Sequence, residues 1–150
     1  MAEALKEAAE AARGGEVPSG AVLAAPDGRL AARGRNRVIS LCDPTAHAEI
    51  LALRAAAADA GNYRLPGFTL VSTLEPCPMC LMAAIHARVK QIIYGAPEPR
   101  WGAAGSLVDL AGLDGLNHRL TLRGGLMADE CRGLISSFFQ RRRKAAGESA

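Results

Sequence analysis

Aromatic side chains are scarce in this sequence. Phenylalanine, tyrosine and tryptophan occur three, two and one times and make up 4% of the 150 residues. This leaves too few rings for an aromatic core, so we expect Ala, Leu, Val and Ile to fill it. Hydrophobic residues still account for 49% of the chain, which argues against intrinsic disorder. The length is typical of one domain, and we expect residues 1–150 to form a single one.

Long apolar runs are also missing. No stretch approaches the ~18 uninterrupted apolar residues of a membrane-spanning helix. Residues 1–13 are charged throughout and lack the apolar segment of a signal peptide. We therefore expect no membrane association and a cytoplasmic location. In that reducing compartment a CxxC pair is more often a metal or redox site than a structural disulfide.

The sequence has little excess of positive over negative charge, since the formal net charge is only +3. This value permits nucleic acid binding without requiring it. The most basic run is Arg141-Arg142-Arg143-Lys144. It fits two interpretations: a solvated helix end whose cations complement the helix dipole, or a contact with phosphate groups.

Hydrophobic periodicity and turn residues predict alternating strands and helices. A first helix over residues 5–12 ends at Gly14-Gly15, and Asp27-Gly28 predicts a hairpin turn between strands 21–25 and 30–38. Asp43-Pro44-Thr45 predicts the start of a helix that runs to about residue 60, with Asp43 or Thr45 as its cap. The expected later elements are strand 68–73, a helix from Pro76 and Pro78 through Val89, strand 91–95, a loop over 96–105, strand 120–122 and a last helix over 127–144. This alternation predicts an α/β layered sheet.

Three potential metal ligands stand at predicted strand-to-helix junctions: His47, Cys77 and Cys80. Cys77 and Cys80 are three positions apart, so in a first helical turn both thiols can reach one ion. Two thiolates and one imidazole leave a tetrahedral zinc ion one open position, which distinguishes catalytic from structural zinc sites. Alternatives are a redox CxxC, half of a structural zinc ribbon, or closure of the site by Cys42 as a fourth ligand. No second CxxC is present to complete a ribbon.

Glu49 is the candidate general acid and base beside this metal. Zinc with two thiolates and a neutral imidazole has a formal charge near zero, and it acidifies a water ligand less than an all-histidine site. A nearby carboxylate is therefore useful as a proton shuttle. Glu49 stands two residues beyond His47, roughly 200° round an ideal helix, and is poorly placed to be a ligand itself. The alternative is an ordinary surface helix residue.

Other conspicuous side chains fit structural roles. We interpret Cys131 as core packing, His86 and His118 as structural residues, and Met79 and Met82 as core or pocket lining.

Several longer segments resemble one family, the bacterial tRNA-specific adenosine deaminases among the cytidine deaminase-type zinc enzymes. The similarity covers nearly the whole chain. Its segments are Glu16-Val17-Pro18-Ser19-Gly20-Ala21, Asp43-Pro44-Thr45-Ala46-His47-Ala48-Glu49-Ile50, Thr73-Leu74-Glu75-Pro76-Cys77, Gly102-Ala103-Ala104-Gly105-Ser106, Leu116-Asn117-His118-Arg119 and Ala128-Asp129-Glu130-Cys131.

The resemblance implies a three-layer α/β/α sandwich with a five-stranded mixed sheet, and a homodimer with one zinc ion per subunit. It implies hydrolysis of adenosine to inosine at the wobble position of a tRNA, bound through its anticodon loop. By motif position, His47, Cys77 and Cys80 hold zinc and Glu49 shuttles protons. Substrate binding is implied for the Asn36 side chain and the Ala48 backbone.

The chain departs from the family pattern in two places. Ser19 stands where the family usually has Val. Ala96-Pro97-Glu98-Pro99-Arg100-Trp101 stands where the family tends to show Ala-Arg-Asp-x-Lys-Thr, in a loop that borders the substrate site. Glu98 keeps the acidic group there and is assigned to substrate binding, while the prolines stiffen the backbone. Trp101 either offers a stacking face for a base or packs beneath the loop or at a dimer contact.

Two other functions share these motifs. One is a deaminase of free nucleobases or nucleosides, of the guanine or cytosine type, with the same zinc site. The other is a non-catalytic zinc module that only binds RNA, against which the presence of Glu49 argues. The residues between Gly102 and Arg119 and the basic end of the last helix favour an RNA substrate.

Overall fold

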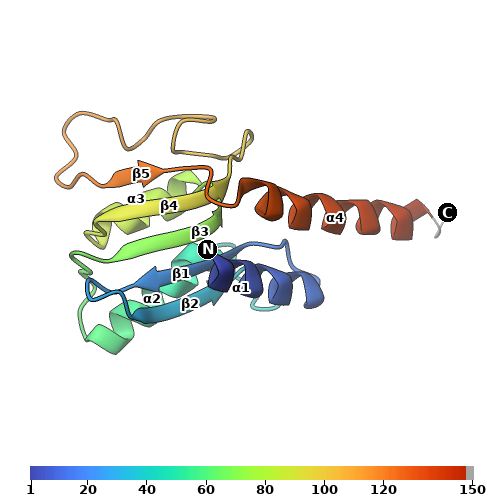
Figure 1. Ribbon diagram of the computed structural model, residues 1–150, viewed down its shortest axis with the longest axis horizontal. Coiled ribbons are helices and arrows are strands. Elements are labelled where there is room, and N and C mark those ends of the chain that lie inside the picture. The colour runs from blue at the N-terminus through green and yellow to red at the C-terminus, as the bar shows by residue number, and fades with distance from the viewer. Residues whose placement is uncertain (148–150) are drawn as a thin grey trace.

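The computed structural model describes residues 1–147, and within them four helices flank a five-stranded mixed sheet (Figure 1). The elements follow in the order α1 (Ala2–Arg13), β1 (Gly20–Ala24), β2 (Leu30–Arg35), α2 (Ala48–Ala60), β3 (Thr69–Leu74), α3 (Pro78–His86), β4 (Gln91–Ala96), β5 (Thr121–Arg123) and α4 (Ala128–Gly147). The predicted fold class is confirmed. None of these helices is long and apolar enough to cross a membrane.

The strands lie in the order β2-β1-β3-β4-β5. β1 pairs antiparallel with both β2 and β3, whereas β3, β4 and β5 run parallel. The Asp27-Gly28 turn closes the β1–β2 hairpin as predicted, with Gly28 at a positive φ of 84°. The parallel pair β3 and β4 needs a crossover, which α3 supplies.

Alternate side chains along each central strand enter different layers. Leu23, Leu70 and Ile92 belong to the larger core, under α2 and α3. Their neighbours in sequence belong to a smaller core under α1: Val22, Val71 and Ile93. The helices α1 and α4 contact each other and share this second face.

Glycines let the helices approach the sheet closely. A Cβ at Gly20 would lie 2.0 Å from the Ala4 carbonyl oxygen of α1, and a Cβ at Gly34 would lie 2.1 Å from that of Ala48 in α2. In β4, a Cβ at Gly95 would meet the Cys131 sulfur of α4 at 2.4 Å. Cys131 is buried there, which confirms its interpretation as core.

The second strand is shorter than predicted. It ends at Arg35 rather than at Val38. The backbone N–H groups of Ile39 and Ser40 donate to the carboxylate of Glu16 instead of extending the ladder, at 3.2 and 2.7 Å. A polar contact distant in sequence therefore turns the chain out of the sheet.

The following helix begins later than predicted, at Ala48. Asp43 does not cap it, because its carboxylate closes a local turn by accepting from the Thr45 N–H and hydroxyl at 2.8 and 2.7 Å. The N-cap is His47, in an extended conformation. This delay leaves the His47 side chain free of helical constraints.

The third helix ends at His86 rather than continuing through Val89. Arg88 adopts a positive φ of 61°, and the Val89 N–H returns to the Ala84 carbonyl at 3.1 Å. The side chain of Val89 is nevertheless fully buried in the larger core.

Candidate zinc and deaminase site

The three predicted metal ligands come from two helix starts. His47 is the N-cap of α2 and Cys77 is the N-cap of α3, both with extended backbone. Pro78 follows at the first helical position, where its missing N–H costs nothing, and Cys80 completes that turn. Because α2 and α3 contact each other on one face of the sheet, these two helix starts lie together. The predicted positions of His47 and Cys77 at helix starts are confirmed.

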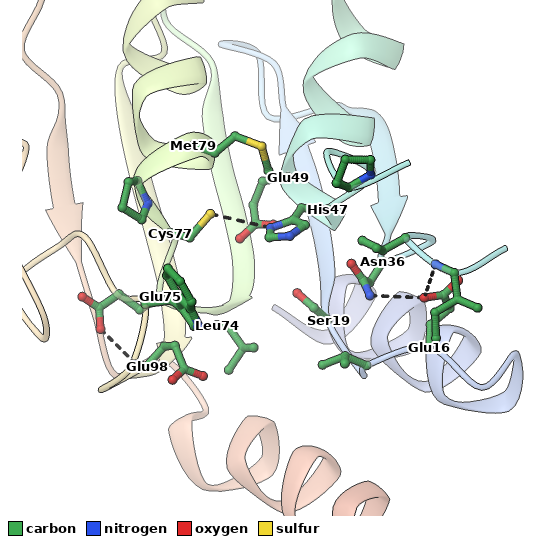
Figure 2. A pocket seen from close by; sticks show the side chains of 16 residues that line it. Glu16, Ser19, Asn36, His47, Glu49, Leu74, Glu75, Cys77, Met79 and Glu98 are labelled. Atoms are coloured by element: carbon green, nitrogen blue, oxygen red, sulfur yellow. Dashed lines mark hydrogen bonds between the residues drawn. The ribbon is translucent and has the colours of Figure 1, made fainter. Parts of the chain in front are cut away.

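The donor atoms are spaced as a tetrahedral zinc ion requires. His47 Nδ1 lies 3.6 Å from the Cys77 sulfur (Figure 2) and 3.5 Å from the Cys80 sulfur. With Zn–N near 2.0 Å and Zn–S near 2.3 Å, a tetrahedral angle separates N and S by about 3.5 Å. Within residues 1–147, this is the one group of three His, Cys, Asp or Glu side chains close enough to share an ion. Its donor set of two sulfurs and one imidazole is one that zinc accepts.

The two thiols share their protons unequally. The hydrogen bond from the Cys80 thiol, helped by His47, lowers the pKa of Cys77 to about 4. The same contact and burial raise the pKa of Cys80. The hydrogen bond between His47 and Cys77 raises the pKa of His47. Cys77 is thus a thiolate at neutral pH even without an ion, which is the form that binds metals.

Glu49 lies beside this group and is buried, with 4% of its surface exposed. Its Oε2 lies 3.6 Å from the Cys80 sulfur, within hydrogen-bonding distance. Burial raises the pKa of Glu49 above its ordinary value. The interpretation as a surface residue is therefore wrong. Its carboxyl group can hold and release a proton next to the metal ligands.

A pocket of about 650 Å³ opens over these side chains. Its residues come from the β1–α1 connection, the chain after β2, the starts of α2 and α3, and the loop after β4. They are Glu16, Val17, Ser19, Asn36, Val38, Ile39, Pro44, His47, Glu49, Leu74, Glu75, Cys77, Pro78, Met79, Glu98 and Trp101. Apolar side chains and several polar or acidic groups share this lining, as in sites for small organic ligands.

Asn36 lines the pocket across from the metal group (Figure 2). Its amide nitrogen donates to the carboxylate of Glu16 at 3.4 Å. Although burial raises the pKa of Glu16, the N–H groups of Ser40 and Ile39 lower it below its ordinary value. Glu16 was not assigned a role from the sequence, although it begins one of the segments that resemble the family.

Glu75 is the second buried carboxylate that sequence reasoning left without a role. Its oxygens accept hydrogen bonds from the backbone N–H groups of Glu98, Ala104 and Ser106 at 3.0, 3.0 and 3.1 Å, and from the Ser106 hydroxyl. These donors outweigh the effect of burial and lower the pKa of Glu75. The carboxylate thus shapes the loop after β4 that carries Glu98 and Trp101.

The remaining candidate residues separate into pocket and non-pocket positions. Glu98 lines the pocket, as does Trp101, which is 66% exposed and therefore does not pack beneath the loop. The Ala48 side chain is fully buried and outside the lining. As the first residue of α2, Ala48 has a backbone N–H without a partner in the helix.

Cys42 is exposed and its thiol donates to the Ile39 carbonyl at 3.7 Å, outside the metal group. The structure therefore contradicts the alternative in which Cys42 is a fourth ligand. Met79 lines the pocket and Met82 packs against the larger core.

The other histidines and the basic run lie away from the pocket. A ring nitrogen of His118 donates to the Val89 carbonyl at 2.7 Å, which is a structural contact. His86 is exposed at the end of α3. The residues Arg141 to Lys144 are exposed on α4, which projects beyond the sheet (Figure 1).

Comparison with known families supports the zinc assignment. The family described as the cytidine and deoxycytidylate deaminase zinc-binding region matches residues 1–96. A solved structure from a study of A-to-I editing by tRNA deaminases at the wobble position of transfer RNA superposes with a TM-score of 0.86 and 43% identity. The superposition covers 89% of this chain and 96% of the chain in that structure.

Two curated relatives extend the comparison. A tRNA-specific adenosine deaminase of Haemophilus influenzae is 44% identical over 144 residues, which are 96% of this chain and 83% of that protein. A tRNA(Ile)-lysidine synthase of Deinococcus deserti is 47% identical over 96% of this chain, but the match spans only 27% of that longer protein.

Proposed function

This chain belongs to the cytidine and deoxycytidylate deaminase family of zinc-binding proteins, and we propose that it is a hydrolase that converts adenosine to inosine at the wobble position of a tRNA. One observation carries this proposal: the buried Glu49 carboxyl group lies against Cys80, whose sulfur is 3.5 Å from His47 Nδ1. The tRNA substrate is supported by the names of similar proteins that the chain covers almost fully.

We propose that His47, Cys77 and Cys80 hold the zinc ion and leave one coordination position for water. When bound, zinc lowers the pKa of a water ligand and supplies a nucleophile near neutral pH. The starts of α2 and α3 point their positive dipole ends at this region, which favours the Cys77 thiolate and negative charge that develops nearby.

Glu49 then manages the protons of the reaction. Its carboxylate takes a proton from the attacking water and gives it to the ring nitrogen N1 of adenine. Oxygen becomes bonded to C6, the C6–N bond breaks, and Glu49 passes the remaining proton to the departing amine. Adenosine and water thus become inosine and ammonia. Burial raises the pKa of Glu49, which favours the protonated form that returns a proton to the ring nitrogen and then to the departing amine.

The substrate contacts are assigned to Asn36, the Ala48 backbone and Glu98. Asn36 and Glu98 line the pocket from different segments, which supports their contact with a bound nucleotide. The N–H of Ala48, unpaired in its helix, is available to an acceptor on the base.

An RNA loop suits this pocket better than a stacked duplex. A base inside a helix cannot reach a buried carboxylate, so the adenosine must be splayed out, as bases in an anticodon loop can be. The pocket volume of about 650 Å³ accommodates one nucleotide without enclosing a whole loop. We extend the proposal to a cytoplasmic homodimer with one zinc ion per subunit, for which sedimentation of the zinc-loaded protein is the test.

The deciding experiment is ammonia release from an anticodon stem-loop with a wobble adenosine. The proposal expects release from this RNA and not from free guanine, cytosine, adenosine or cytidine. The reverse pattern would establish the alternative, a deaminase of free bases or nucleosides. No release from any of them, with RNA binding that weakens steeply in salt, would establish a non-catalytic RNA-binding module.

A further inference from the structure

Trp101 is the one tryptophan in the sequence and lies on the lining of the candidate active-site pocket. It is 66% exposed. Within residues 1–147 its ring takes part in no aromatic pair and no cation–π contact. Tryptophan is usually well buried, so a ring left open to solvent beside a pocket is a candidate contact for a ligand.

The backbone on both sides of Trp101 is anchored. The Gly102 N–H donates to the Glu98 carbonyl at 2.7 Å, and the Ala103 N–H donates to the Pro76 carbonyl at 2.9 Å, directly before Cys77. Pro97 and Pro99 restrict the backbone just ahead of the ring. The loop is thus tied to the start of α3, which carries the metal ligands.

Glu75 adds a second anchor from inside the loop. Its carboxylate binds the N–H groups of Glu98, Ala104 and Ser106, so it spans the segment that contains Trp101. A Cβ at Gly102 would lie 2.3–2.5 Å from this carboxylate, which shows how closely the loop wraps it. An exposed side chain on a fixed backbone loses little entropy when a ligand covers it.

We propose that Trp101 is a stacking platform for the nucleobase next to the target adenosine in the RNA strand, an inference that rests on the proposed function. The target base must reach the buried end of the pocket, where Glu49 is only 4% exposed. Its neighbours in the strand stay at the mouth, where Trp101 presents its ring. Stacking on an aromatic side chain accepts any base, and it is a general means of holding unpaired nucleotides.

Arg100 supports an RNA strand rather than a free base at this position. Its side chain is 81% exposed and lies 3.9 Å from Glu98, a weak pair at most. A cation next to an exposed ring fits a nucleotide that carries both a base and a phosphate.

Tryptophan fluorescence tests the platform without any catalytic step, because Trp101 is the one tryptophan in the sequence and is the source of all of the tryptophan emission. Zinc-loaded protein is titrated with the product stem-loop, which carries inosine at the wobble position. We expect quenching that saturates with the Kd measured separately by anisotropy of labelled RNA. Binding in the anisotropy assay with unchanged fluorescence would overturn the platform. So would a fluorescence change that follows protein concentration alone, since a second copy would then cover the ring.

Kinetics with matched variants identify the stacked base. Trp101→Ala should lower kcat/KM on the adenosine stem-loop by about 5- to 150-fold, mainly through KM, whereas Trp101→Phe should keep most of it. Tyr63→Ala is the control, since Tyr63 is 64% exposed but does not line the pocket.

Two further substrates carry an abasic nucleotide, one directly 5′ and one directly 3′ of the target. For the wild type we expect one of them, and not the other, to lower kcat/KM by a similar factor. On that substrate Trp101→Ala should cause no further loss, because the stacking partner is already gone. The proposal would be contradicted if Trp101→Ala lowered kcat/KM on both abasic substrates by the same factor as on the intact stem-loop. Wild-type protein that deaminates neither stem-loop nor abasic substrates would instead contradict the proposed function, and a fully active Trp101→Ala would remove the platform alone.

Discussion

The amide group of Asn36 is oriented by the carboxylate of Glu16. Nδ2 of Asn36 lies 3.4 Å from Oε2 of Glu16 (Figure 2). Backbone donors lower the pKa of Glu16, so this side chain is ionised at neutral pH and can only accept hydrogen bonds. The nitrogen of the amide must therefore face Glu16, and Oδ1 of Asn36 is left for the pocket. The site thus offers an acceptor there, suited to a hydroxyl or amino group of a ligand.

We expect Asn36→Asp to raise KM and to destabilise the fold by about 1–3 kcal/mol, because it sets a second carboxylate against Glu16. Adding Glu16→Gln should recover part of the stability, since the new amide can donate to the carboxylate at position 36. Thermal unfolding and steady-state kinetics on the stem-loop measure the two effects. Equal KM values for Asn36→Asp and wild type would show that Asn36 does not contact substrate.

Glu49→Gln should abolish turnover while leaving zinc in place. The substitution keeps the shape of the side chain and all three proposed ligands, but it removes the group that carries protons. General acid–base catalysis of this kind contributes about 10²- to 10⁴-fold, and kcat should fall by at least that factor. Metal content by mass spectrometry is the control for an intact site. Near-normal turnover with full zinc occupancy would remove Glu49 from the mechanism.

Cys80→Ser should lose zinc and lower the melting temperature, because metal binding stabilises only the folded arrangement of ligands. A strong chelator should shift the wild type in the same direction. The matched control is Cys42→Ser, since Cys42 is exposed and outside the metal group. That variant should retain zinc and activity. Loss of metal from Cys42→Ser would instead indicate a fourth protein ligand.

The residues of the candidate metal group could be found from the sequence because much of their pattern is local. Cys77 and Cys80 share one helical turn, and Pro78 indicates where that helix begins. His47 was placed correctly at a helix start even though the helix begins later than expected. The burial of Glu49 did not follow from its position one residue inside α2, because that position also fitted a surface residue.

The contacts that shape the rest of the pocket could not be predicted in this way. The Glu16 carboxylate binds the Ser40 N–H across 24 positions, and Glu75 binds the Ala104 N–H across 29. Such pairs leave no periodic signal, because the partners are backbone groups that every residue has. The contacts of Glu16 with Ile39 and Ser40 account for the early end of β2. Sequence periodicity indicated the elements, whereas buried carboxylates determine how the chain leaves them.

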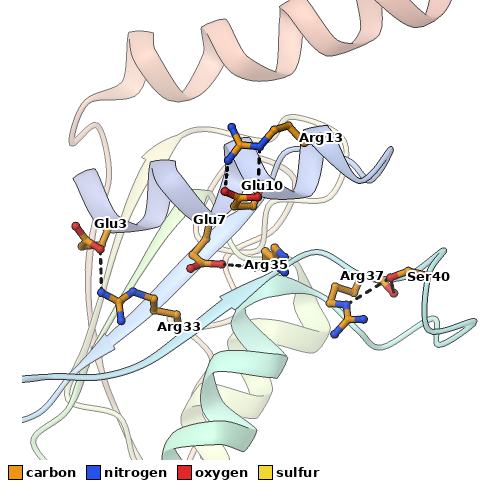
Figure 3. A network of polar contacts seen from close by, with 8 residues as sticks. All are labelled: Glu3, Glu7, Glu10, Arg13, Arg33, Arg35, Arg37 and Ser40. Carbon is orange, nitrogen blue, oxygen red and sulfur yellow. Dashed lines mark hydrogen bonds and ion pairs between the residues drawn. The ribbon is translucent and has the colours of Figure 1, made fainter.

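Polar contacts at the surface have a smaller role. Glu3 and Glu7 of α1 pair with Arg33 and Arg35 of β2 at 3.0 and 3.2 Å (Figure 3). Exposed pairs of this kind contribute little to stability, because water and salt screen the two charges. They align the helix with the edge of the sheet, but the close approach at Gly20 and the apolar side chains beneath α1 account for its packing.

Gly102→Ala should disturb the active-site loop, because the added methyl group would lie 2.3–2.5 Å from the Glu75 carboxylate. We expect a lower melting temperature and a higher KM on the stem-loop. Gly133→Ala is the matched control, since no atom lies within 4 Å of a Cβ there. In helix α4 that change should be neutral or stabilise by up to ~1 kcal/mol. Equal behaviour of the two variants would show that the loop does not depend on its fit around Glu75.

Acid should destabilise this protein through Glu16 and Glu75. Both have a folded-state pKa below the ordinary value of 4.5, so their contribution to stability is fully present above pH 4.5. It is lost as the pH falls from 4.5 through the lowered folded-state values, because the unfolded chain then binds protons more readily. Melting temperatures between pH 6 and about pH 3 measure this loss. Glu16→Gln should start less stable at neutral pH and lose less on acidification. Protonation of the zinc ligands affects both proteins, so the difference between the two curves is the quantity to compare. Parallel curves would show that folding does not lower the pKa of Glu16.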